Sequence, residues 1–217
     1  MTQPRSRIGA TEAASSLPKT AGVTTFKVFF VAAALWAVVS SDASAHSFTA
    51  ALLIVGEERE ESLAEAVRGF LLATDESDGH MNETSDGHLG GVDVQVLALP
   101  RDAAGLVEGL VGTPDEVPDV LVVIGPELSA SEAALVYQWA SPVLLPGVLP
   151  EGWDTDARAD SFAARFRRAY GTAPGETAVI AYNAARRLDA AIRSLDGVSP
   201  RAALENALRT TEAGLPW

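Results

Sequence analysis

Two short, almost uninterrupted apolar runs, each closed by a glycine, constrain the fold of this chain most. Residues 48–55 read FTAALLIV before Gly56, and residues 119–124 read DVLVVI before Gly125. Runs of this length and composition are typical of strands that are covered on both faces of a parallel sheet. We therefore expect these two segments to form the centre of such a sheet.

Helix signals follow both of these runs. Ser62 and Glu65 have the spacing of a capping box, and so do Ser129 and Glu132. In such a box the serine accepts a hydrogen bond from the first turn and the glutamate returns one, so we expect a helix to begin at each serine.

The rest of this half of the chain continues the alternation. Residues 92–99 and 142–145 predict two more strands, 102–112 predict a short helix, and the polar, glycine-rich residues 75–91 predict a loop. Alternating strands and helices with buried strands indicate the α/β class. The expected fold is a doubly wound parallel sheet of about four to five strands, followed by C-terminal helices.

The C-terminal part of the chain has helical periodicity only. Phe162, Phe166 and Tyr170 recur at a spacing of four and are most simply core residues. Ser199 and Pro200 predict a last helix with a serine N-cap and proline at its first position. Between them lies the longest amphipathic pattern, with apolar residues at Ile180, Ala184, Leu188, Ala191 and Leu195.

The N-terminal 45 residues have the features of a secretory signal. Basic residues precede an apolar run over 28–39, and the small residues Ala43 and Ala45 then match a signal-peptidase site. The run has 12 residues, too few for the roughly 20 that a membrane-spanning helix needs. We expect a signal peptide over 1–45, cleaved after Ala45, and a single domain over 46–217 with no membrane span; the alternative is an uncleaved N-terminal anchor.

Charge and cysteine content exclude several classes of function. The chain has 16 basic and 29 acidic residues, a net charge of −13, and no basic island that a nucleic acid would need. It has no cysteine, which excludes disulfides, thiolate metal sites and a lipid attached to cysteine. Without a lipid tether, we expect the exported protein to be free in the periplasm.

Several segments resemble one protein family in the order in which they occur. Residues 162–174 read F-x3-F-x3-YG-x2-P, residues 181–184 read AYNA, and residues 122–126 read VVIGP. Together they resemble the type I periplasmic binding proteins, the leucine/isoleucine/valine-binding group of ABC transporter receptors, over nearly all of 48–209. Asn183 stands where that family usually has aspartate.

The resemblance implies a solute-binding role on a shortened scaffold. Family members have two α/β lobes that close on a ligand, whereas here the residues matching the end of lobe one lead within 15 residues into the C-terminal helices. The chain therefore looks like one lobe, reconnected across 149–160. A single lobe covers one side of a small ligand, whereas tight pockets bury most of it, so we expect weak affinity unless a partner supplies the other wall.

The candidate ligand contacts lie at the carboxyl ends of the predicted strands, where open parallel sheets bind ligands. These candidates are Glu58, Arg59, Glu127, Ser129 and Gly147. The resemblance implies that the loop after the third strand contacts ligand through a serine hydroxyl and backbone N–H groups, and Ser129 is the nearest match. The alternative is that Ser129 is only a helix N-cap.

The charged residues at the carboxyl ends of the strands indicate which charge a ligand there would carry. Glutamates at 57, 58, 60, 61 and 127 make the edge acidic, so a cationic group is favoured over a bare carboxylate, and Arg59 is the nearby counter-charge. The plainer interpretation of 57–61 is a solvated helix entry whose acidic residues suit the helix dipole.

Three histidines are weak candidates for metal ligands. The sequence Ser-Asp-Gly-His at 77–80 recurs at 85–88, which places His80 and His88 near several carboxylates. Cleavage after Ala45 would leave His46 at the new N-terminus. Coincidence within a polar insertion explains all three more simply, so we predict neither a metal site nor a cofactor.

No set of nucleophile, base and orienting residue is visible in the sequence, and Gly90-Gly91 is not followed by the G-K-[ST] of a phosphate loop. We therefore expect no enzyme activity. Two functions remain open: a shortened receptor of an ABC importer for amino-acid-like solutes, acting with a permease or as a homodimer, and a periplasmic interaction module that has lost solute capture. Because fold alone does not fix function, both rest on the resemblance.

Overall fold

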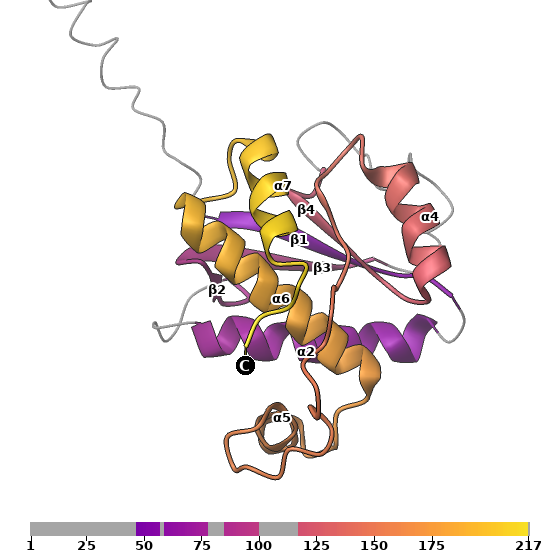
Figure 1. The fold of residues 1–217 in the computed structure, drawn as a ribbon, viewed down its shortest axis with the longest axis vertical. Coiled ribbons are helices and arrows are strands. Elements are labelled where there is room, and N and C mark those ends of the chain that lie inside the picture. The colour runs from indigo at the N-terminus through magenta and orange to yellow at the C-terminus, as the bar shows by residue number, and fades with distance from the viewer. Residues whose placement is uncertain (1–46, 57–58, 78–84, 100–116, 217) are drawn as a thin grey trace, which may run out of the picture. The chain divides into compact units, whose positions relative to one another are not determined.

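The computed structural model describes residues 47–56, 59–77, 85–99 and 117–216, all within one compact unit, Ala45–Trp217. The fold belongs to the α/β class, with helices on both faces of a five-stranded sheet (Figure 1). Among these residues no helix combines the length and apolar character needed to cross a membrane.

The sheet has the strand order β2-β3-β1-β4-β5. β1 pairs in parallel with β3 and β4, and β4 pairs in parallel with β5, whereas β2 is antiparallel to β3. β5 is therefore an edge strand. The strands are β1 (Ser47–Ile54), β2 (His88–Leu89), β3 (Val92–Ala98), β4 (Val120–Ile124) and β5 (Val143–Leu144).

The described residues form five helices; α6 and α7 cross over the strands in the view of Figure 1, and α5 lies beyond α2, away from the strands. Alternate residues of β1 and β4 point into a large core that they share with α2, α5, α6 and α7, and the intervening residues into a smaller core with α4. The helices are α2 (Arg59–Ser77), α4 (Glu127–Tyr137), α5 (Phe162–Tyr170), α6 (Glu176–Leu195) and α7 (Arg201–Thr210).

The close packing of α2 against α6 explains a glycine in the middle of α2. A Cβ atom built on Gly69 would lie well inside van der Waals contact of the Ala178 carbonyl group. Glycine in a helix interior costs about 1 kcal/mol relative to alanine. Here the absence of a side chain lets the two helices approach.

The helix predicted from Phe162, Phe166 and Tyr170 is confirmed as α5. The Ser161 hydroxyl accepts a hydrogen bond from the Ala164 N–H at 3.3 Å, and Gly171 ends the helix with φ +75°. Phe162 and Phe166 are buried core residues as predicted, and Tyr170 packs partly buried against them.

The capping-box predictions are wrong. α2 begins at Arg59 and α4 at Glu127, so Ser62 and Ser129 lie inside helices, and Pro126 is the N-cap of α4 without any side-chain cap. The S-x-x-E spacing also fits one turn within a helix, and the half-buried Glu65 carboxylate accepts a hydrogen bond from the Gly175 N–H at 2.6 Å instead of capping α2. The acidic residues Glu60 and Glu61 instead occupy the first turn of α2, where they suit its dipole.

The predicted loop over 75–91 is partly wrong. α2 continues to Ser77, and His88–Leu89 forms β2, the antiparallel edge of an otherwise parallel sheet. Pro200 is the N-cap of α7 rather than its first residue, and the helix expected over 102–112 lies outside the described residues.

Candidate functional site

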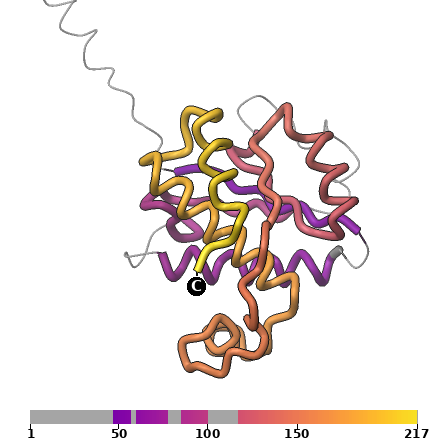
Figure 2. Tube along the Cα trace, viewed as in Figure 1, coloured from indigo at the N-terminus to yellow at the C-terminus, as the bar shows by residue number. Residues whose placement is uncertain are grey.

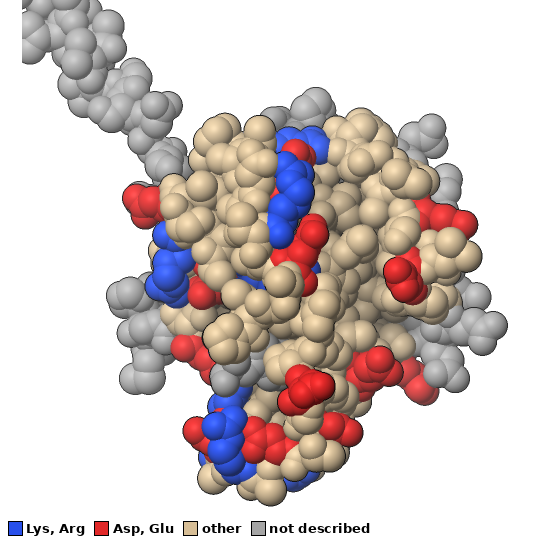
Figure 3. All heavy atoms as spheres, in the orientation of Figure 1, with Lys and Arg blue, Asp and Glu red and all other residues tan. Residues whose placement is uncertain are grey.

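A cavity of about 750 Å³ lies along the edge of the sheet at β5. Val143 and Leu144 of β5 form its floor with Leu145, and Leu135 of α4 and Leu208 of α7 contribute apolar groups from the sides. In Figure 3 charged side chains form a column along α7, and the surface between this column and α4 is largely uncharged. The cavity therefore combines an apolar floor with polar and charged residues, which are Gln138, Arg187, Arg201, Glu205, Arg209 and Glu212.

Arg187 is the most buried charged residue that lines this cavity. It comes from α6, and only 1% of the residue is exposed. Its Nε donates to the Thr211 hydroxyl at 3.0 Å, its Nη2 donates to the Leu208 carbonyl at 3.2 Å, and its Nη1 donates to the Leu145 carbonyl. The guanidinium thus joins α6 to the edge of the sheet and to the end of α7.

All three hydrogen-bond acceptors of Arg187 are neutral. Arg187 takes part in none of the ion pairs found among the described residues. Burial lowers the pKa of the guanidinium, while the charge of Glu212, an exposed residue at the cavity, acts in the opposite direction. A buried cation with neutral partners is costly unless an anion lies close to it.

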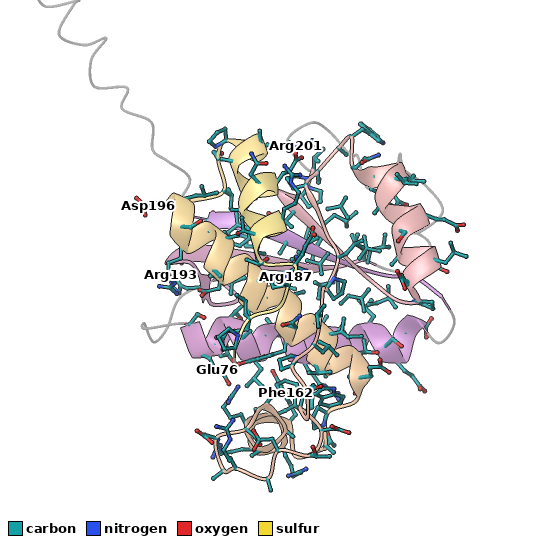
Figure 4. The ribbon with its side chains drawn as sticks, viewed as in Figure 1. Glu76, Phe162, Arg187, Arg193, Asp196 and Arg201 are labelled. Carbon is teal, nitrogen blue, oxygen red and sulfur yellow. The ribbon has the colours of Figure 1, made fainter. Side chains whose placement is uncertain are left out.

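Arg201 closes the cavity where α7 begins and α4 ends. Its guanidinium donates to the carbonyls of Gln138, Trp139 and Ala140, and its Nε lies 2.7 Å from Glu205 Oε1. Gln138 is the C-cap of α4, and Trp139 and Ala140 lie in the turn after it, so Arg201 holds this end of α4 from another element. Figure 4 shows Arg201 at the start of α7 and Arg187 on α6.

The segment that follows β5 is held against α6 by Asn183. The buried Asn183 amide donates from Nδ2 to the Pro146 carbonyl at 2.7 Å and to the Val148 carbonyl at 3.3 Å. Gly147, between these residues, has φ +74°, and a Cβ atom there would lie 2.7 Å from Arg187 Nη1. The segment thus passes close to the guanidinium. It then continues to α5, as the trace in Figure 2 shows.

One of the five predicted ligand contacts, Gly147, lines the cavity at β5. Glu127 and Ser129 lie in the first turn of α4 and are not among the lining residues of that cavity. Arg59 is the first residue of α2, and Glu58 lies outside the described residues. The loops after β1 and β4 do adjoin, as parallel strands require, since a Cβ atom on Gly56 would lie 3.0 Å from Pro126.

His88 is the histidine that the structure describes, and it contacts a residue of the neighbouring strand. His88 Nε2 lies 2.6 Å from Asp93 Oδ1, and these two residues face each other in the antiparallel register. His46 and His80 lie outside the described residues. In the part of the chain that the structure describes, no three His, Cys, Asp or Glu residues are grouped to hold a metal ion.

The sequence analysis missed Arg187, although α6 carried a signal for it. Asn183 and Arg187 are spaced by four on the longest helix, directly beside its apolar stripe at Ala184 and Leu188. Both are buried, so the buried face of α6 is wider than its apolar stripe and includes these two residues. Polar residues at the border of an apolar stripe are candidates for hydrogen bonds to neighbouring segments.

A second surface feature lies on α4, on the side away from the sheet. Leu128, Leu135, Val136 and Trp139 are all exposed, at spacings that place them on one side of the helix and of the turn after it. Leu135 is 69% exposed and Trp139 is 59% exposed. We refer to these four residues as the α4 stripe.

Comparisons with protein-family models, with curated proteins and with solved structures find no match for this chain. The interpretation of the site therefore depends on its geometry and chemistry.

Proposed function

We propose that this chain is an exported solute-binding protein, a one-lobed relative of the type I periplasmic binding proteins, and that the cavity at β5 holds its solute. The observation that carries the proposal is the cavity itself. Its volume of about 750 Å³ falls in the range of small-molecule sites, and its lining combines an apolar floor with polar and charged side chains.

The position of the cavity also supports a binding role. Gly147 and Leu145 follow β5, so the cavity reaches the carboxyl end of the last parallel strand. Ligands of open α/β sheets lie beyond these strand ends. This placement replaces the predicted site at the starts of α2 and α4 with one beside β5.

The other side of the ligand would be covered by a partner. A cavity at a sheet edge leaves part of a small molecule in contact with water, which limits affinity. In the role that we propose, the permease of an ABC importer or a second copy of the chain covers this side. Solutes of the branched-chain amino acid or amide class fit the apolar floor formed by Val143, Leu144 and Leu145.

Thermal unfolding of the purified protein with a panel of amino acids, small amides, organic acids and polyamines tests the proposal. A solute at about 100 times its Kd should stabilise the protein by roughly 2.7 kcal/mol, which raises Tm by several degrees. Ala134→Trp, which places an indole in the cavity, should abolish the shift. Ala169→Trp, on the exposed side of α5, should preserve it. A cooperative transition that no solute moves would contradict the proposal.

The α4 stripe favours a second candidate function, that of a periplasmic interaction module. Contiguous exposed apolar side chains mark protein-binding surfaces. For this role, the double variant Leu135→Ser and Trp139→Ser should lose partners that the wild-type protein retains in a pull-down from its own periplasm. Leu97→Ser, at an exposed residue of β3, is the matched control and should retain them. Equal retention by both variants would exclude the α4 stripe as the binding surface.

A further inference from the structure

The charges around the cavity at β5 differ from those of the whole chain. The chain has a net charge of −13, yet the cavity is lined by three arginines and two glutamates, a surplus of one positive charge. Arg201 and Glu205 form an ion pair across 2.7 Å and neutralise each other. The remaining charged residues are Arg187, Arg209 and Glu212.

Among these residues Arg187 alone is buried; Arg209 and Glu212 are exposed to solvent. Water stabilises the charges of exposed residues, whereas Arg187 has only neutral acceptors around it. Glu212 does not lie within ion-pair distance of the guanidinium. Among the described residues, therefore, no carboxylate pairs with the positive charge at the inner wall of the cavity.

Two N–H groups of the Arg187 guanidinium have no acceptor among the described residues. A guanidinium has five N–H groups, and three of them donate to Thr211, Leu208 and Leu145. One N–H remains on each of the two terminal nitrogens. Two N–H groups match the two oxygens of one carboxylate, and the geometry of arginine suits such a pair.

We propose that Arg187 recognises a carboxylate, and that the ligand of this cavity is a monocarboxylate with a compact apolar body. The surplus of one positive charge matches a monoanion rather than a phosphate ester or a dicarboxylate. Val143, Leu144 and Leu135 then contact the apolar body at the floor and the α4 side of the cavity. This inference rests on the proposed function, and it reverses the expectation from the acidic loop edge that a cationic group is favoured.

Matched pairs of ligands test the inference on the wild-type protein. Isovalerate and isovaleramide have the same apolar body and differ in charge, and benzoate and benzamide form a second pair. Isothermal titration at pH 7 should give a Kd for each acid about ten- to a hundredfold lower than for its amide, the range expected for hydrogen bonds to a charged group. Arg187→Lys should weaken acid binding about tenfold more than it weakens amide binding, because lysine keeps the charge and loses the paired donors.

The outcomes separate this inference from the proposed function. Equal Kd values for acid and amide, or a preference for the amide, would overturn the carboxylate assignment while the solute-binding function stands. Binding of the acid that is unchanged in Arg187→Lys would also overturn it. If Arg187→Lys does not fold, Ala134→Trp replaces it, and acid binding that survives this variant would place the carboxylate elsewhere. Failure of every solute in the panel to bind would overturn both proposals.

Discussion

Replacing Asn183 with aspartate should destabilise the fold strongly, because only an amide can donate to the segment that reconnects β5 with α5. The Asn183 side chain is fully buried, and its Nδ2 donates to the carbonyls of Pro146 and Val148 at 2.7 and 3.3 Å. An ionised aspartate would lose both hydrogen bonds and turn a negative charge toward two carbonyl oxygens.

The expected size of the effect follows from these contacts. Each lost hydrogen bond costs about 1 kcal/mol, and a buried carboxylate that faces two carbonyl oxygens adds a few kcal/mol more. We expect Asn183→Asp to lower the free energy of unfolding by about 4 kcal/mol at pH 7. Asn183→Ala, the control, removes the same bonds without adding a charge and should cost about 2 kcal/mol.

Urea unfolding at several pH values measures both variants. Burial raises the pKa of the introduced carboxyl above its ordinary value, near 4 for aspartate, so its destabilisation is present at neutral pH and decreases as the pH falls toward 4. Protonation also restores one O–H donor. Equal stability of the Asp and Ala variants from pH 5 to pH 8 would refute the proposed role of the amide.

Three further changes probe the packing that positions the site. Gly69→Ala should lower stability by about 1–3 kcal/mol in a denaturant melt despite the better helix propensity of alanine, because the Ala178 carbonyl occupies the space; a gain in stability would contradict the close contact of α2 and α6. Burial and the charge of Glu76 raise the pKa of Tyr182, so its contribution is complete below pH 10 and is lost as the pH rises through its folded pKa. Tyr182→Phe should flatten the alkaline decline, and an unchanged decline would refute this assignment. Arg201→Met should cost about 1 kcal/mol by uncapping α4, whereas Glu205→Gln, which removes only an ion pair, should cost less than about 0.5 kcal/mol.

The sequence was most informative where burial is continuous along the chain. β1 and β4 are short apolar runs that end at glycines with positive φ. The sequence therefore predicted both the strands and the residues at which they end. The α5 helix was equally clear, since Phe162 and Phe166 repeat on one face and Gly171 ends it. These elements and the α/β class depend on local patterns.

The remaining features depend on contacts between distant segments. β2 has two residues and exists because His88 and Leu89 pair with β3, so no local pattern marks it. Ser129 was predicted as a ligand contact at a strand end or, alternatively, as a helix N-cap, whereas α4 begins two residues before Ser129 and uses Pro126 as its N-cap. Arg187 becomes a site residue only because the segments after β5 and α7 converge on it.

The measurement that tests the central claim most directly is an NMR titration of the Arg187 side chain. Its Nε–H donates to Thr211 in a buried position, which protects it from exchange with water, and Arg187→Lys identifies its resonance by removing it. Addition of isovalerate should move this resonance in a saturable way with the Kd obtained by calorimetry, and isovaleramide should leave it in place. An Arg187 resonance that stays fixed while isovalerate saturates the protein would contradict the assignment of the cavity at β5 as a carboxylate-binding site.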